Sequence, residues 1–167
     1  MPHSLIAVVW RGATVAGTLA VLATAALAGE WGHYANARFG FNIDVPPDFV
    51  AHGESDNGDG QFFDTPTAEF LVFGSSMLDE TLEAVADRVK SQMEQDHYTV
   101  TYEASTPSWA SFSGVNGGTI IYVRLIPLCG GIAFGEFTLS YGRADVAKFD
   151  PVITRLVRSF TSGTDAC

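Results

Sequence analysis

Residues 119–126, with the sequence Thr-Ile-Ile-Tyr-Val-Arg-Leu-Ile, form a strand pattern that is apolar on both of its faces. Successive side chains of a strand point to opposite faces of its sheet. One face here carries Ile121, Val123 and Leu125, and the other carries Ile120, Tyr122 and Ile126. A strand of this kind has to be covered on both sides. We therefore expect a sheet with helices packed on both of its faces.

Three more strand patterns lie near this one in the chain, and turn residues separate them. The turns contain Thr106-Pro107, the glycine-rich segment 114–118 and the segment 129–131. Because the connections are short, a long antiparallel meander is the simplest way to join the strands. The additional strands are expected at residues 98–104, 108–113 and 132–141.

The first half of the chain contains shorter strand patterns. In residues 39–45, apolar side chains alternate with small or polar ones, and Pro46-Pro47 ends the strand because proline donates no ladder hydrogen bond. Thr65-Pro66-Thr67 predicts a hairpin turn, and the segment before residue 39 is expected to be a lead-in. The remaining strands are expected at residues 49–52, 61–64 and 68–75.

Two segments show the helical period instead. In residues 79–96, apolar side chains recur at intervals of three and four, and Asp79 or Thr81 can cap the helix. The last element covers residues 144–160. There we expect Pro151 in the first turn of a helix that Asp150 caps.

These elements predict one α+β domain over residues 29–167. The chain of 167 residues is long enough for one ordinary domain with a substantial core. We expect a mainly antiparallel sheet of about six strands, covered by helices on both faces.

Residues 1–28 have the pattern of a bacterial signal peptide. Residues 12–27 contain no ionisable side chain, and Ala26-Leu27-Ala28 is a small-x-small site that would leave Gly29 as the first mature residue. The apolar run is shorter than the roughly 20 residues that span a membrane. The sequence therefore predicts a periplasmic or secreted protein without a stable membrane anchor.

The mature chain is strongly acidic. All 19 acidic residues but only eight of the nine basic residues follow residue 28, so the formal charge after cleavage is −11. Phosphate-backbone binding needs clustered Lys and Arg, so a nucleic-acid partner is excluded from our expectations. A basic partner would be attracted, although acidity of this kind more commonly only keeps an exported domain in solution.

Arg124 interrupts the apolar strand of residues 119–126. A charge at this position must reach solvent or pair with a carboxylate, and Glu103 and Glu136 lie on neighbouring predicted strands. Such an ion pair could be purely structural, or it could belong to a ligand groove. The candidate groove consists of Glu103, Trp109, Tyr122, Arg124 and Glu136.

Two further features are candidates for covalent or metal chemistry. Cys129 and Cys167 could form a disulfide bond in an oxidising compartment, and a free Cys129 or an intermolecular bond are the alternatives. Asp56, Asn57 and Asp59 supply oxygen atoms suited to Ca²⁺, but a tight turn explains them better because the EF-hand spacing is absent. We find no motif for a catalytic site, another metal or a cofactor.

The order of the elements, together with several short sequence segments, resembles that of the Mog1/PsbP-like fold. The resemblance rests on the opening segment 39–46, on the single long helix from Thr81, on the sheet that follows, and on the closing Arg158-Ser159-Phe160. The segments 57–60, 107–109 and 129–131 are also similar to those of an uncharacterised group of exported bacterial proteins. The resemblance implies an antiparallel sheet sandwiched by helices.

Members of this fold include photosystem-associated accessory proteins, a regulator of a small GTPase and bacterial envelope proteins. The resemblance therefore implies a non-catalytic binding or envelope-accessory role, with another envelope protein as the partner. Fold alone does not transfer function. The alternative is a small hydrolase or lyase with a shallow site around Glu103, Trp109, Arg124 and Glu136.

Overall fold

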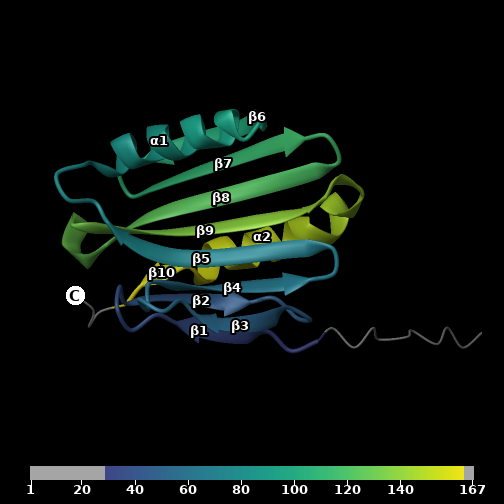
Figure 1. Ribbon diagram of the computed structural model, residues 1–167, viewed down its shortest axis with the longest axis horizontal. Coiled ribbons are helices and arrows are strands. Elements are labelled where there is room, and N and C mark those ends of the chain that lie inside the picture. Colours follow the sequence, from purple (N-terminus) through teal and green to yellow (C-terminus); the bar gives the residue numbers. More distant parts are fainter. Residues whose placement is uncertain (1–28, 164–167) are drawn as a thin grey trace, which may run out of the picture.

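The computed structural model describes residues 29–163, which form two antiparallel sheets and two long helices (Figure 1). The predicted signal peptide and Cys167 lie outside the described residues. The larger sheet has seven strands in the order β3-β4-β5-β9-β8-β7-β6. These strands are β3 (Val50–Glu54), β4 (Gly60–Thr65), β5 (Ala68–Ser76), β6 (Thr99–Thr106), β7 (Trp109–Asn116), β8 (Thr119–Leu128) and β9 (Ala133–Gly142).

The expected meander is confirmed. Strands β6, β7, β8 and β9 follow one another in space and pair antiparallel, and β9 then pairs with β5. The hairpin of β4 and β5 turns at Pro66-Thr67, as expected, because Thr65 pairs with Ala68. The prediction of about six strands is one strand short for this sheet.

A second, three-stranded sheet was not expected. It consists of β1 (Gly32–Ala35), β2 (Phe41–Val45) and β10 (Thr161–Ser162), in the order β1-β2-β10. The alternation in β2 is as predicted, with Phe41, Ile43 and Val45 buried. In β1 only Tyr34 is buried, so the sequence shows no alternation and the strand exists through its pairing with β2.

The helix α1 (Leu82–Gln95) begins and ends close to its predicted bounds. Thr81 caps it, since its hydroxyl oxygen accepts a hydrogen bond from the Ala84 N–H at 3.2 Å. The buried side chains of α1 pack on β7, β8 and β9, where they form one core cluster with Phe112, Val123 and Phe134. The helix also carries the chain from β5, in the middle of the sheet, to β6 at its far edge.

The helix α2 (Val146–Ser159) starts earlier than predicted, so the predicted start at Asp150 and Pro151 is wrong. Pro151 lies inside the helix instead of in its first turn, and Asp150 is helical instead of being the cap. The physical reason is packing: Phe149 is almost fully buried, and its ring stacks on Tyr141 with 4.5 Å between the centroids. Burial of this ring outweighs the helix hydrogen bond that proline cannot donate.

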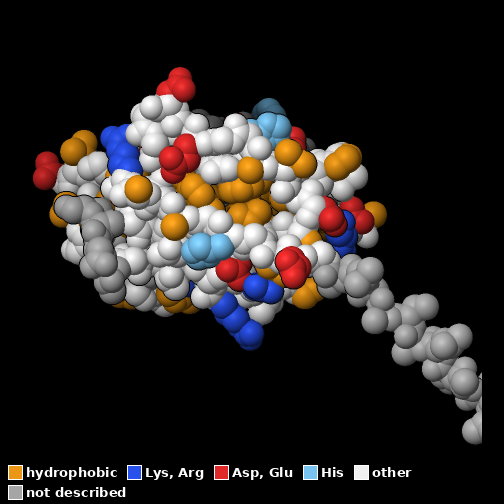
Figure 2. Space-filling view, turned by 90° about the horizontal axis from the view of Figure 1, so that it is seen from below, with side chains coloured by type: hydrophobic (Ala, Val, Ile, Leu, Met, Phe, Trp, Pro, Cys, Tyr) orange, Lys and Arg blue, Asp and Glu red, His pale blue; other side chains and the backbone are white. Residues whose placement is uncertain are grey.

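The sheet is covered on both faces, as expected, but by different layers. The helix α1 lies on one face, while α2 and the small sheet lie on the other, where Phe149 and Leu156 join the second core cluster. Seen from below, apolar side chains gather between charged ones at the end where β1 and β3 lie (Figure 2). Trp31 and Phe49, which precede these strands in the chain, pack against the second cluster.

Each layer covers only part of its face. On the face opposite α1, Tyr102 of β6 remains 49% exposed, and Trp109 of β7 is only partly buried. On the α1 face, Val50 of β3 and Leu71 of β5 are exposed. The offset between the two layers therefore leaves an open area at each end of the large sheet.

Candidate functional site

Arg124 lies on the open area opposite α1. In the register of the sheet it stands between Ser111 on β7 and Phe137 on β9. Its guanidinium group lies over the ring of Trp109, 4.2 Å from the ring centroid. Its Nη1 donates a hydrogen bond to Ser111 Oγ at 3.0 Å. Strand pairing and an aromatic ring thus hold the guanidinium group in place.

The expected ion pair of Arg124 with Glu103 or Glu136 does not form. Glu103 pairs in register with Phe112, and Glu136 pairs with Leu125, so both carboxylates are on the α1 face. Arg124 is on the other face because side chains alternate along β8. Among the described residues no carboxylate lies within ion-pair distance of Arg124, and its buried Nε has no acceptor.

Tyr122 completes the surroundings of the guanidinium group. Its hydroxyl donates to Ser111 Oγ at 3.1 Å, and its ring stacks on Phe137. Burial lowers the pKa of Arg124 and raises the pKa of Tyr122. Both shifts have the same cause, which is that polar groups stand in a poorly hydrated environment.

We call this cluster the Arg124 platform, and it can bind an anion. A guanidinium group has five N–H donors in a fixed planar arrangement that matches a carboxylate. One donor is used by Ser111 and the buried Nε has no acceptor. In the register of the sheet, Tyr102 stands across Ser113 from Tyr122, and its exposed ring offers apolar contact on the same face. The platform consists of Tyr102, Trp109, Ser111, Tyr122 and Arg124.

The structure therefore brings together three of the five predicted groove residues and separates the other two. Trp109, Tyr122 and Arg124 share one face, while Glu103 bonds to Lys90 of α1 on the other. Glu136 also lies under α1. A catalytic site that combines Arg124 with both carboxylates is not formed. Sequence reasoning missed Ser111 and Tyr102, because the predicted strand order does not give the register, which decides the side chains that share a face.

In the loop of the calcium candidate, residues 55–59, the polar side chains form hydrogen bonds with one another. Asp59 accepts hydrogen bonds from Ser55 Oγ at 2.5 Å and from Asn57 Nδ2 at 2.8 Å. The Ser55 hydrogen bond is also the main cause of a lowered pKa of Asp59. In residues 29–163 no group of three His, Cys, Asp or Glu side chains is arranged to hold a metal ion.

Cys129 lies in the turn after β8, partly buried against the second core cluster. Its predicted partner, Cys167, is outside the described residues, so the disulfide bond stays a prediction.

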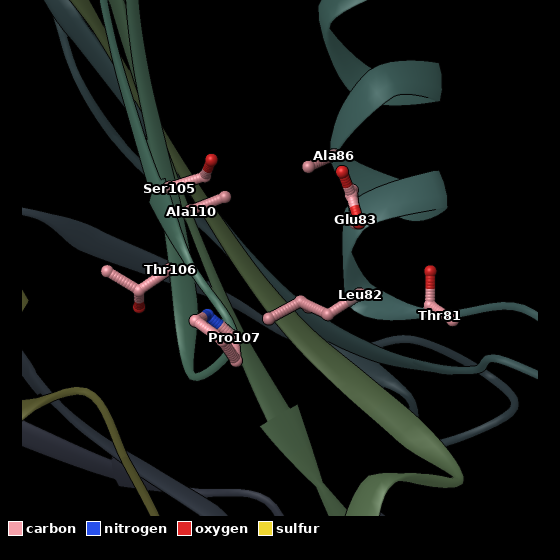
Figure 3. A pocket seen from close by; sticks show the side chains of 8 residues that line it. All are labelled: Thr81, Leu82, Glu83, Ala86, Ser105, Thr106, Pro107 and Ala110. Atoms are coloured by element: carbon pink, nitrogen blue, oxygen red, sulfur yellow. The ribbon is translucent and has the colours of Figure 1, made fainter.

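A hollow of about 370 Å³ separates the start of α1 from the turn between β6 and β7 (Figure 3). Small side chains cause it, since Ala86 on the helix and Ala110 on the sheet face each other across the gap. The Thr81 hydroxyl already caps the helix, and Glu83 is the only ionisable side chain in the lining. We find no cluster of polar groups in this hollow that would define a ligand.

Comparison with known proteins identifies the architecture. No protein-family model matches the sequence, and no sequence relative is found among curated proteins. Solved structures do match. Cyanobacterial PsbP from Synechocystis has a TM-score of 0.61 and 12% identity, with 87% of this chain and 99% of that chain covered. The Ran-binding protein Mog1p from Saccharomyces cerevisiae has a TM-score of 0.58 and 12% identity, with 80% and 95% covered.

The chain has the Mog1/PsbP-like fold. The fold predicted from the sequence is thereby confirmed. At 12% identity the match concerns the Mog1/PsbP-like architecture alone and assigns no role to the Arg124 platform. Within residues 29–163, no helix of this domain is long and apolar enough to cross a membrane.

Proposed function

We propose that this chain is an exported, non-catalytic binding domain that holds another envelope protein on its Arg124 platform. The group recognised is a carboxylate of the partner, presented beside an apolar or aromatic side chain. The observation that carries the proposal is a partly buried guanidinium group clamped on Trp109 without any carboxylate among the described residues. Export rests on the signal-peptide pattern of residues 1–28.

A second arginine of the protein also lies over a tryptophan ring and can be compared with Arg124. Arg155 of α2 also lies 4.2 Å from the centroid of a tryptophan ring, that of Trp31. Its Nε, however, donates to Asp44 Oδ2 at 2.8 Å. The two sites share the same stacked geometry, and only Arg124 lacks the carboxylate. A partner's carboxylate would accept hydrogen bonds from the Nη atoms of Arg124, since its Nε is enclosed, whereas Asp44 accepts from the Nε of Arg155.

Desolvation makes such contacts selective. The guanidinium group of Arg124 is partly desolvated, and a hydrogen bond to a charged group contributes about 1.5–3 kcal/mol, so a partner's carboxylate on the Nη atoms would be bound favourably. Because the domain is acidic overall, a strongly acidic partner would be repelled at long range, whereas a single carboxylate would not. Mog1p is named as a Ran-binding protein, so a protein partner is compatible with this architecture.

The test is site-specific photo-crosslinking in the cells that produce the protein. A photoreactive residue replaces Ala104, which pairs with Ser111 in the platform, and captured proteins are mapped by mass spectrometry. We expect one partner, crosslinked close to an Asp, a Glu or a C-terminal carboxylate. Arg124→Gln should reduce its yield at least tenfold.

Arg155→Gln is the matched control, because it removes an equally stacked guanidinium group that already has its carboxylate. This variant should keep the full crosslinking yield. Equal capture by both variants, or a crosslink that maps away from any carboxylate, would contradict the proposal. A circular dichroism spectrum of each purified variant checks that the fold is intact.

A further inference from the structure

A second recess lies on the opposite face of the sheet, between α1 and the strands β8 and β9. Its volume is about 360 Å³, which is at the small end of ligand pockets. Four apolar side chains form much of its wall: Val89, Met93, Ile121 and Val123. Glu136 and Thr138 of β9 contribute polar groups to it. We call it the Glu136 cleft.

The Glu136 carboxyl group is incompletely bonded. Its Oε1 accepts a hydrogen bond from Thr138 Oγ1 at 3.3 Å. Among residues 29–163, no group donates to Oε2 and no cation lies within ion-pair distance. Of the described side chains, Arg124 Nε is the polar atom that is both fully enclosed and unpaired. The unpaired Oε2 of Glu136 is therefore not fully enclosed, and Glu136 lines the cleft.

The other two charged side chains of the cleft, Arg88 and Asp96, form hydrogen bonds with groups other than Glu136. Arg88 donates from Nη2 to Glu80 at 3.1 Å, and its guanidinium group lies near the ring of Phe134. Asp96 accepts a hydrogen bond from Gln92 at 3.1 Å. The cleft therefore contains two carboxylates and one paired arginine, so its unbalanced charge is negative.

We propose that the Glu136 cleft binds a small organic cation, an ammonium group on an apolar body, with Glu136 as its counter-ion. The ammonium group would donate to the open Oε2, and the apolar body would lie along the Val89 and Ile121 wall. A bare metal ion is disfavoured because the described residues supply no group of three ligands here. This site is independent of the Arg124 platform, since the sheet separates the two.

The titration of Glu136 gives the proposal a pH signature. Burial raises the pKa of Glu136 to about 7, while Thr138 and Arg88 oppose the rise. A primary ammonium group keeps its proton well above that pH. The cation should therefore bind the ionised form of Glu136, and its affinity should rise roughly tenfold between pH 6 and pH 8.

The experiment is calorimetric titration of the purified protein with phenethylammonium, with 2-phenylethanol as the neutral probe of the same shape. We expect the amine to bind and the alcohol to bind at least tenfold more weakly. Binding at pH 6 should release protons, which appears as a dependence of the measured enthalpy on the buffer. Glu136→Gln should reduce amine affinity at least tenfold.

Glu103→Gln is the control, because Glu103 lies on the same face but is paired with Lys90 outside the cleft. It should leave amine binding unchanged. Equal binding of amine and alcohol, affinity that falls as the pH rises, or full binding by Glu136→Gln would each overturn the proposal. The pH and alcohol comparisons need no variant, so they decide the matter even if Glu136→Gln fails to fold.

Discussion

Two ionisable side chains stand in the central strands of this sheet without a full partner. Arg124 pairs in register with Phe137, and Glu136 pairs with Leu125. The two residues are thus diagonal neighbours on β8 and β9, yet they project to opposite faces. The backbone of the sheet prevents an ion pair that their closeness in space would otherwise allow. Each charge is instead available to a ligand on its own side.

At this scale the stability of the protein should depend on the protonation of Glu136. Its pKa in the folded state is about 7, above its ordinary value of 4.5, because burial disfavours the carboxylate. Between these values the folded state binds more protons than the unfolded state, so this group makes stability fall as pH rises through that window. The contribution of protonated Glu136 to the free energy of unfolding is lost as the pH rises through about 7.

Glu136→Gln should remove the fall in stability that ionisation of Glu136 causes, because glutamine does not titrate. From pH 5 to pH 8, the free energy of unfolding of the variant should gain about 1–3 kcal/mol relative to that of the wild type. Urea unfolding at several pH values measures it. Other carboxylates titrate in both proteins and cancel in the difference. A difference that does not change with pH would mean that Glu136 titrates normally.

At the scale of elements, the two helices differ in how far local signals describe them. The predicted cap Thr81 begins α1, and no tertiary contact displaces it. In α2 the proline and the aspartate gave a plausible start that the structure does not use. The burial of Phe149 against Tyr141 extends the helix by another turn at its N-terminal end. A local start signal is overridden where a large side chain gains burial.

Pro151→Ala distinguishes the two helix starts. Inside a helix, proline costs about 3 kcal/mol relative to alanine, and its stiffening of the unfolded chain returns less than about 1 kcal/mol. We therefore expect the substitution to raise the free energy of unfolding by about 2–3 kcal/mol in urea titration. Were Pro151 in the first turn, as the sequence suggested, the gain would be absent.

Pro66→Ala is the contrasting variant, because Pro66 lies in the tight turn between β4 and β5. There the proline only restricts the unfolded chain, so its loss should lower stability by about 0.4–1 kcal/mol.

For the whole molecule, the predicted bond between Cys129 and Cys167 would tie the end of the chain to the body. Cys129 lies in the turn after β8 and packs on the core, which gives the bond a firm anchor. Closing a loop of this length stabilises a protein by about 3–4 kcal/mol. We expect Cys167→Ser to lower the free energy of unfolding by about that amount.

The bond itself is checked by alkylation with iodoacetamide and mass spectrometry of the exported protein without reductant. An unmodified monomer indicates the intramolecular bond, and a disulfide-linked dimer indicates the intermolecular alternative. Two alkylated cysteines would show that the prediction is wrong.

The order of elements, the meander and the two-sided burial of residues 119–126 were predictable from the sequence. Each of them depends on a local period of side chains, which a single strand or helix carries by itself. Short sequence segments also carried the resemblance to the Mog1/PsbP-like fold, and the solved structures confirm that fold.

Which side chains meet could not be predicted without the three-dimensional arrangement of the strands. Alternation assigns faces within one strand, but the relation between strands depends on register, and a bulge between Val100 and Tyr102 shifts it on β6. The bulge turns Glu103 away from Arg124, and the regular register of β8 and β9 places Glu136 opposite Leu125 instead of Arg124. Both carboxylates were therefore wrongly placed beside Arg124, whereas Ser111 and Tyr102 were overlooked. The small sheet follows the same principle, because β1 and β10 are strands only through their pairing with β2.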